Sequence, residues 1–186
     1  MFRALPFIES ERLTLRLLSQ EDLEAVLSYW RDNQEHLAPY GPAWPDSYLT
    51  EEFWIEQIKK HLVEYSEDVS ARMFLFERGG TEIVGNVSFA GILRSAAQFC
   101  YLGYNLAQNK QRLGYMTEIL PLAINFAFDK MRIHRVMANY MPSNERSGRL
   151  LKRLGFTVEG YARDYLCLNG KWEDHILTSF SNANWK

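Results

Sequence analysis

Hydrophobic and polar residues follow two periods along this chain, one typical of strands and one typical of helices. Residues 12–17 alternate strictly between polar and apolar side chains, which predicts a half-buried strand. Ser19 and Asp22 then have the spacing of a capping box and predict a helix that runs to about residue 32. Thr50 is placed to cap a second helix, in which apolar residues recur at helical spacing.

Two dipeptides that contain glycine predict tight turns later in the chain. Gly79-Gly80 and Asn169-Gly170 each separate two apolar runs, which is the pattern of a β-hairpin. With three further apolar runs, these hairpins give seven predicted strands, at residues 12–17, 72–77, 82–90, 98–106, 133–141, 161–168 and 172–180.

Two more helices lie between these strands. One is predicted from about residue 114 to 131 and contains Pro121, which should kink it or remove one hydrogen bond. The other covers residues 144–154 and ends at Gly155. Because no repeat, low-complexity tract or linker interrupts this order, we expect one domain of the mixed α+β class, with a central sheet covered by helices.

Composition and charge exclude several classes of protein. The chain has 186 residues, of which 47% are hydrophobic and 24% charged, as in an ordinary globular domain. The net charge of −2 gives no strong attraction to nucleic acid or to an anionic membrane. No apolar run is long enough to span a bilayer, and no His/Cys cluster has metal-ligand spacing. Cys100 and Cys167 are expected to be buried thiols and not a disulfide, so we expect a cytoplasmic protein. Because no metal-ligand spacing is present, we also expect no metal.

A short segment with a glycine, Gln111 to Met116, connects the strand at 98–106 to the following helix. Such a loop presents unpaired backbone N–H groups and the positive end of a helix dipole, which together favour a pyrophosphate. The segment lacks both the GxxxxGK[ST] pattern of nucleoside-triphosphate loops and the GxGxxG dinucleotide fingerprint. An ordinary strand-to-helix turn is the alternative that the segment alone leaves open.

About thirty residues later, a strand, a break at Pro142-Ser143-Asn144 and a short helix ended by Gly155 form a second block. In this order, the two blocks resemble the GNAT superfamily of N-acetyltransferases. The resemblance covers roughly residues 8–180 and is greatest for the RimJ/RimL branch, and within it for enzymes that acetylate the N-terminal alanine of a small-subunit ribosomal protein. It rests on Tyr101-Leu102-Gly103-Tyr104, His134-Arg135, Asn144-x-x-Ser147, Leu154-Gly155-Phe156, Glu159-Gly160-Tyr161, Arg163-Asp164-Tyr165 and Asn169-Gly170-Lys171-Trp172-Glu173-Asp174-His175.

This resemblance implies the GNAT fold and a site for acetyl-CoA. The fold is a mostly antiparallel, twisted sheet of about seven strands, splayed between the strands at 98–106 and 133–141, where acetyl-CoA lies. Arg112 replaces the first loop glycine of the family, so it could crowd the turn or add a phosphate contact. Asn144 matches the asparagine that holds the pantetheine arm, although a plain helix cap is the alternative. The implied cofactor residues are Tyr104, Asn105, Leu106, Gln111, Arg112, Leu113, Gly114, Tyr115, Met116, Asn144 and Ser147.

The family reaction is direct attack of an amine on the thioester. The departing thiolate needs a hydrogen-bond donor, and many superfamily members use a tyrosine at the position that is Leu151 here. Ser147 matches the RimJ/RimL serine proposed to protonate this thiolate, while a helix-surface serine is the alternative. Acyl transfer to Cys100 would require a ping-pong reaction, but no histidine is its sequence neighbour, and a buried thiol is expected instead.

The general base is not identified by the sequence. Glu118, Asp164 and Glu77 are candidates because of the elements on which they lie. Glu118 could equally stabilise the start of its helix, and Asp164 could pair with an arginine. The position of the base proposed for the RimL type appears as Leu166 here, so that assignment does not transfer. His134 is expected to have a structural role.

Aromatic residues indicate where an acceptor would bind. The loop at 36–48 and the hairpin around Gly170 are rich in them, and they could wall a narrow slot for a peptide N-terminus or simply cover the core. Carboxylates nearby could meet a basic ribosomal-protein tail or form a solvated helix face: Asp46, Glu51, Glu52 and Glu56. The predicted substrate-binding residues are Tyr40, Trp44, Tyr165 and Trp172.

The predicted activity is therefore transfer of acetyl from acetyl-CoA to the N-terminal amine, with alanine expected, of a ribosomal protein. A small-amine acetyltransferase acting on a polyamine or aminoglycoside is one alternative, and it would need several carboxylates around the slot. A non-catalytic acyl-CoA-binding module is another, to which the leucine at position 151 gives some support. We expect no direct contact with nucleic acid or membrane, and either a monomer or a homodimer.

Overall fold

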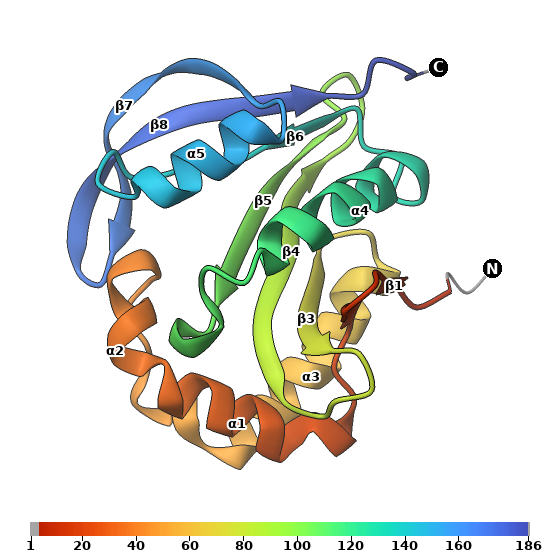
Figure 1. Ribbon diagram of the computed structural model, residues 1–186, viewed down its shortest axis with the longest axis vertical. Coiled ribbons are helices and arrows are strands. Elements are labelled where there is room, and N and C mark those ends of the chain that lie inside the picture. Colours follow the sequence, from red (N-terminus) through yellow and green to blue (C-terminus); the bar gives the residue numbers. More distant parts are fainter. Residues whose placement is uncertain (1–3, 186) are drawn as a thin grey trace.

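The computed structural model describes residues 4–185, which form a sheet of eight strands flanked by helices (Figure 1). The strands are β1 (Phe7–Glu9), β2 (Leu13–Arg16), β3 (Ala71–Glu77), β4 (Ile83–Leu93), β5 (Phe99–Leu106), β6 (Arg135–Met137), β7 (Thr157–Leu168) and β8 (Lys171–Ser181). The helices are α1 (Leu23–Asp32), α2 (Gln34–Leu37), α3 (Glu51–Ser66), α4 (Tyr115–Asp129) and α5 (Glu145–Arg153), with short 3-10 turns between some of them.

The sheet has the strand order β1-β2-β3-β4-β5-β6-β8-β7, and its pairs are antiparallel except for β5 with β6. That parallel pair holds for only three residue pairs, from Phe99 with Arg135 to Tyr101 with Met137. Beyond it β5 and the segment that follows β6 diverge. That segment pairs with β8 through Tyr140 and Ile176. The mostly antiparallel, splayed sheet expected from the sequence is confirmed, with one additional strand, β1.

The strand predicted at 133–141 is much shorter in the structure. Only β6 is regular, because the chain after it leaves β5 at the splay and meets β8 by one isolated bridge. The two hairpins are confirmed: β3 pairs with β4 across Gly79-Gly80, and β7 with β8 across Asn169-Gly170. Both residues of the second turn have positive φ, +45° and +81°, as a two-residue hairpin turn requires.

Alternating side chains of the central strands place a core on each face of the sheet. Met73 and Leu75 belong to the core covered by α4, while Phe74 and Phe76 belong to the core covered by α1 and α3. Both faces are thus buried, as Figure 1 shows for the helices in front of and behind the sheet. Among residues 4–185, no helix combines the length and hydrophobicity needed to cross a membrane.

Helix ends follow the predicted signals with one difference. Thr50 caps α3, since its hydroxyl accepts a hydrogen bond from the Phe53 N–H. The capping box of Ser19 and Asp22 is present, but it opens a 3-10 turn that precedes α1. Gly155 ends α5 with a φ of +90°, a conformation that glycine adopts without strain.

Asp22 fixes this turn against the sheet. Its carboxylate accepts two hydrogen bonds from Arg16, both 2.7 Å long, and one from the Ser19 N–H. Burial alone would raise the pKa of Asp22, but these hydrogen bonds outweigh it and hold the pKa below its usual value. The carboxylate is therefore stabilised in its charged form in the folded protein.

We expect Asp22→Ala to lower the free energy of unfolding by about 2 kcal/mol at pH 7, because Arg16 loses its charged partner. The pKa of Asp22 is depressed on folding, so this contribution is present above the unfolded pKa and is lost as pH falls through the folded pKa. Urea unfolding of both proteins from pH 7 down to acid pH measures it. A stability difference that stayed constant below the folded pKa would contradict this origin.

Candidate active site

Two cavities meet where the sheet splays. The first, which we call the loop cavity, has a volume of about 1050 Å³ and lies between β5, the segment before α4 and the start of α5. The second, which we call the aromatic cavity, has a volume of about 610 Å³ and lies between the other side of the splay and the segment from α2 to α3. Residues common to both walls are Leu37, Tyr40, Tyr104, Asn105, Asn144 and Ser147.

The loop cavity is built to hold an anion. Its wall contains the start of α4, where backbone N–H groups have no partner within the helix and the helix dipole is positive. The cationic side chains in its wall outnumber the single carboxylate, Glu145. Of the loop residues predicted from the sequence, Gln111, Arg112, Gly114, Tyr115 and Met116 line this cavity, whereas Leu113 does not. The cations are Arg112, Arg146, Arg149 and Arg153.

Arg112 has a backbone conformation that is typical of glycine. Its φ is +65°, in the left-handed region, where a residue with a Cβ atom is strained by roughly 1 kcal/mol. Gly114, the N-cap of α4, also lies there, with a φ of +82°. Arg112 therefore adds a positive charge to the loop cavity at a backbone position that glycine would occupy without strain.

We expect Arg112→Gly to weaken acetyl-CoA binding about fivefold at low salt, because one phosphate contact is lost while the turn is retained. The loss should shrink as ionic strength rises. Isothermal titration calorimetry at two salt concentrations measures both effects, and Arg112→Gln separates the charge from the backbone strain. Equal affinity of the wild-type protein and both variants would show that Arg112 makes no phosphate contact.

Gln111 connects opposite walls of the loop cavity, a feature that the sequence did not indicate. Its amide oxygen accepts a hydrogen bond from Arg146 on α5, and its amide nitrogen lies 2.8 Å from Nε2 of His36 on α2. The bridge fixes the start of the loop relative to both helices.

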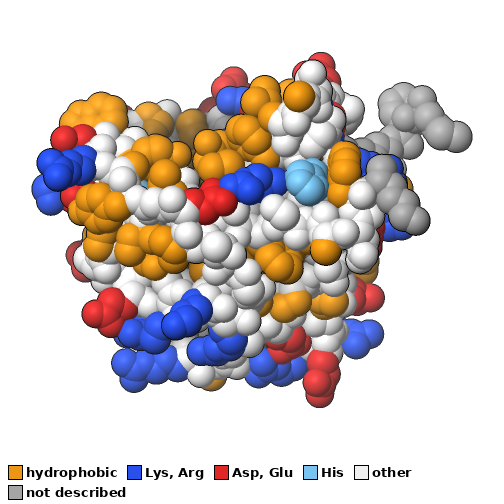
Figure 2. Space-filling model, turned by 90° about the horizontal axis from the view of Figure 1, so that it is seen from above, with side chains coloured by type: hydrophobic (Ala, Val, Ile, Leu, Met, Phe, Trp, Pro, Cys, Tyr) orange, Lys and Arg blue, Asp and Glu red, His pale blue; other side chains and the backbone are white. Residues whose placement is uncertain are grey.

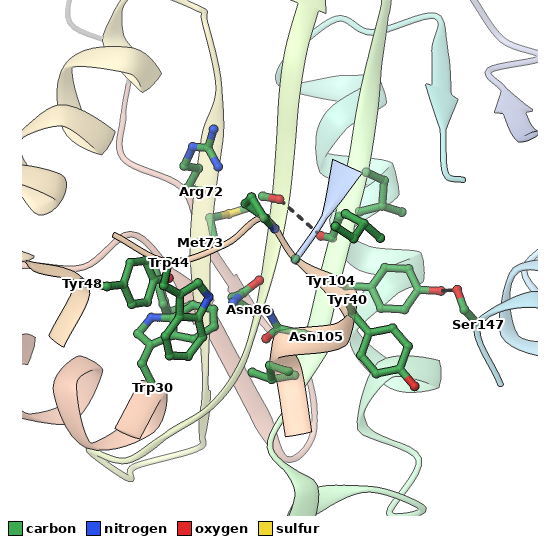
Figure 3. A pocket seen from close by; sticks show the side chains of 18 of the residues that line it. Trp30, Tyr40, Trp44, Tyr48, Arg72, Met73, Asn86, Tyr104, Asn105 and Ser147 are labelled. Carbon is green, nitrogen blue, oxygen red and sulfur yellow. Dashed lines mark hydrogen bonds between the residues drawn. The ribbon is translucent and has the colours of Figure 1, made fainter. Parts of the chain in front are cut away.

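The aromatic cavity has walls of stacked rings. Trp44 and Tyr48 stack with centroids 4.4 Å apart, and Trp30 meets both of them edge-on (Figure 3). Tyr40 and Trp44, predicted to bind substrate, both line this cavity. Tyr165 lies behind its wall, against the ring of His175, and Trp172 is 60% exposed and lines neither cavity.

Charge in the aromatic cavity is one-sided. Among the described residues that line it, none is Asp or Glu, whereas Lys60 and Arg72 are cationic and both pair with Glu64, which lies outside the wall. Two histidines, His61 and His175, complete its titratable lining apart from tyrosines. The four carboxylates at positions 46, 51, 52 and 56 are not part of its wall. The cavity therefore favours a neutral amine or an anionic group over a polycation.

Ser147 lies where the two cavities join. Its hydroxyl is 2.7 Å from the hydroxyl of Tyr104, which points from β5 into the splay (Figure 3). Burial raises the pKa of Tyr104 to about 12, so this hydroxyl keeps its proton. Leu151 is 1% exposed and cannot donate a hydrogen bond, whereas the Tyr104–Ser147 pair offers hydroxyls at this point.

Asn144 is placed for both roles considered from the sequence, as a helix cap and as a contact to the pantetheine arm. Its side-chain oxygen accepts a hydrogen bond from the Ser147 N–H at 3.2 Å and so caps α5. Its side chain also belongs to the wall of both cavities, and the amide nitrogen has its hydrogens available to a ligand. Capping thus orients the amide for a second contact.

Two of the three carboxylates considered as bases have structural partners. Glu118 accepts hydrogen bonds from the Ser10 hydroxyl and from Arg12, and Glu77 accepts them from Lys110 and the Tyr115 hydroxyl. Asp164 is exposed, with a φ of +45°. None of these three carboxylates lines either cavity in the part of the chain that the structure describes.

The two cysteines differ in burial. Cys100 is fully buried, and burial raises its pKa to about 12, so it is not an acyl acceptor. Cys167 is exposed, contrary to prediction, because it lies on the long β7–β8 hairpin beyond the core.

Comparison with known proteins agrees with this geometry. The acetyltransferase (GNAT) domain family matches residues 12–157. The chain is 38% identical to the [ribosomal protein uS5]-alanine N-acetyltransferase of Escherichia coli, over 96% of this chain and 92% of the relative. It is 31% identical to a probable N-acetyltransferase of Bacillus subtilis, YjcK, over 95% and 98% of the two chains.

Solved structures give the same result. The ribosomal-protein-S5-alanine acetyltransferase from Vibrio fischeri superimposes with a TM-score of 0.92 at 33% identity, covering 97% of this chain and 99% of that one. A Mycobacterium smegmatis RimJ in complex with CoA-disulfide has a TM-score of 0.86 at 22% identity, covering 94% and 86%, and it shows the shared fold. This chain belongs to the GNAT family of acetyltransferases.

Proposed function

We propose that this protein transfers an acetyl group from acetyl-CoA to the N-terminal α-amine of a ribosomal protein, with alanine as the expected first residue. The observation that carries the proposal is the junction of the two cavities at Ser147, with an anion-binding wall on one side and aromatic walls without carboxylates on the other. The Escherichia coli and Vibrio fischeri relatives are named for alanine acetylation of a ribosomal protein, and they match almost the whole chain.

Acetyl-CoA fits the loop cavity and supplies the acetyl thioester. Backbone N–H groups at the start of α4, with Arg112, would hold its pyrophosphate. The unpaired edge of β5 from Tyr104 to Leu106 offers backbone groups to the pantetheine arm, and Asn144 offers its amide nitrogen. The thioester then lies at the junction, within reach of Ser147.

Tyr104 and Ser147 would assist the leaving group. The two hydroxyls form a chain in which Tyr104 donates to Ser147 and Ser147 donates to the sulfur as the carbon–sulfur bond breaks. A hydroxyl is a weak acid, but it is a sufficient hydrogen-bond donor for a thiolate, which is a stable anion near its own pKa of about 8.5. The pair would therefore take the role of the tyrosine that many superfamily members have at the position of Leu151.

The walls of the aromatic cavity favour a peptide over a polyamine. A polyamine carries several positive charges and needs carboxylates close by to repay their desolvation. The wall instead carries Lys60 and Arg72, and the nearby carboxylate of Glu64 is already paired with both of them. A peptide presents a single α-amine, which is already partly neutral at pH 7, and a backbone and side chain that stacked rings can accommodate.

Intact-mass spectrometry with acetyl-CoA and a panel of acceptors tests the proposal. The panel contains an alanine-starting ribosomal-protein peptide, the same peptide with its amine blocked, spermidine and an aminoglycoside. We expect a gain of one acetyl group on the free alanine peptide alone. Acetylation of spermidine or the aminoglycoside instead would overturn the substrate, and acetyl-CoA binding without transfer to any acceptor would favour a non-catalytic module.

A further inference from the structure

His175 lies on β8 at the place where this strand borders the splay. Its neighbour Ile176 exchanges backbone hydrogen bonds with Tyr140, at 2.9 and 3.2 Å, on the chain that diverges from β5. The His175 side chain is 3% exposed and lines the aromatic cavity, as Ser147 does. A buried imidazole thus lines the same cavity as Ser147, the cavity proposed for the acceptor.

The hydrogen bonding of His175 determines which ring nitrogen carries its proton. Nδ1 lies 2.9 Å from the backbone carbonyl oxygen of Glu173. A carbonyl oxygen can only accept, so Nδ1 must be the donor, and in the neutral ring Nε2 has a free lone pair. The ring also packs against Tyr165, which Asn139 holds in place through a hydrogen bond to its hydroxyl. The imidazole is therefore fixed in the tautomer that can take up a proton at Nε2.

We propose that His175 is the general base of this acetyltransferase, taking the proton from the acceptor ammonium through Nε2, directly or by one water. The inference rests on the function proposed above and names the group that makes the amine nucleophilic. It needs no carboxylate in the aromatic cavity, in agreement with the residues that line that cavity.

The proton balance closes with groups on the page. Nε2 takes one proton from the bound ammonium, and the neutral nitrogen forms a bond to the acetyl carbon while the carbon–sulfur bond breaks. The nitrogen loses a second proton as the amide forms, and this proton goes to the thiolate, which is held by Ser147, to give CoA-SH. His175 returns its proton to solvent, so one proton is released per turnover, as the conversion of an ammonium to an amide requires.

His61 is the other histidine of the aromatic cavity, and it is a poor base. It stands on α3, and burial, with Arg72 and Lys60 nearby, lowers its pKa to about 4. A base this weak would accept little of the proton from an ammonium near neutral pH. It therefore serves as a matched control in the same cavity.

Other ionisable groups around His175 keep their charge state across the neutral range. Burial raises the pKa of Tyr165 and brings that of Tyr104 to about 12, so both stay protonated. The hydrogen bond from Tyr161 lowers the pKa of Asp174, which stays ionised, and Glu173 is paired with Lys171 at 2.6 Å. A change between pH 6.5 and pH 9 in the rate of a His175 variant relative to wild type would thus report on the protonation of the acceptor amine.

The test compares kcat/KM of wild-type protein and His175→Asn for the alanine peptide at two pH values. Asparagine can keep the hydrogen bond to the Glu173 carbonyl while it removes the base. An α-amine with a pKa of about 7.7–8.0 is only roughly 4% neutral at pH 6.5 and almost fully neutral at pH 9. We expect the variant to lose about 20-fold at pH 6.5 and less than about twofold at pH 9.

His61→Asn should show the same ratio to wild type at both pH values, because it removes no base. A peptide whose first residue has an electron-withdrawing side chain, and hence a much lower amine pKa, should restore the rate of His175→Asn at pH 6.5. An equal loss at both pH values, or no loss, would overturn the proposal. Should wild type acetylate another amine instead, the same comparison with that amine tests His175 separately from the substrate; no acetylation at all would overturn both.

Discussion

Gly114→Glu should weaken acetyl-CoA binding by more than about 100-fold. Gly114 has a φ of +82° at the N-cap of α4, and a side chain there is strained by roughly 1–2 kcal/mol. The added carboxylate would also stand beside the position proposed for the pyrophosphate and repel it. The same carboxylate would take up the positive end of the helix dipole, which would otherwise attract the pyrophosphate. Arg12 lies near this position, but its guanidinium is engaged by Glu118.

Gly114→Asn separates the two causes. Asparagine tolerates the left-handed conformation better than other residues and carries no charge, so we expect a loss of affinity below about tenfold. Calorimetric titration of acetyl-CoA into both variants measures the difference, with thermal unfolding as a check that each is folded. Undiminished affinity in Gly114→Glu would place the phosphate site outside this loop.

Turns and helix caps could be predicted from the sequence more accurately than the length of each strand. Turn dipeptides and caps are local signals, so Asn169-Gly170 and Thr50 were identified from their neighbours alone. The length of β6 depends instead on where the chain parts from β5, which is a tertiary feature that an apolar run at 133–141 does not encode. Apolar residues recur along this segment because they stay buried in the core even after regular pairing ends, as Ala138 and Met141 do.

Site residues were predicted best where a backbone conformation defines them. Gly114 and the loop around it follow from the start of a helix, and Arg112 has the positive φ that glycine adopts without strain. Side chains on the long hairpin were harder, since register shifts in β7 decide which face each one occupies, and Trp172 turns outward. Glu118 lies on the predicted helix, but its ion pair with Arg12, 106 residues away in the sequence, is visible only in three dimensions.

His175 illustrates the same limit from the opposite side. It was part of the motif at 169–175, yet no local feature of the sequence distinguishes a catalytic histidine on a strand from a structural one. What does so is the contact of Nδ1 with a carbonyl and the position of the ring in a cavity whose other walls come from distant segments. Function here depends on a juxtaposition that pattern and propensity do not specify.

The hydroxyl pair at the junction gives the second large effect. Ser147→Ala should lower kcat about 100-fold with little change in the KM for acetyl-CoA, because the donor to the departing thiolate acts mainly in the transition state. Tyr104→Phe should lower kcat by a similar factor if its hydroxyl acts through Ser147, at a distance of 2.7 Å. Ser88→Ala, a serine of the aromatic cavity one strand away, is the matched control and should change kcat far less.

The double variant Ser147→Ala/Tyr104→Phe decides whether the two hydroxyls form one unit. If Tyr104 donates to Ser147 and Ser147 to sulfur, removing either breaks the chain, and the double variant should be no slower than the Ser147 variant. Multiplied losses would instead mean that each hydroxyl contacts the thiolate independently. Unchanged kcat in Ser147→Ala would remove the pair from the mechanism and direct attention to other donors at the splay, such as the backbone N–H groups of β5 and the hydroxyl of Tyr140.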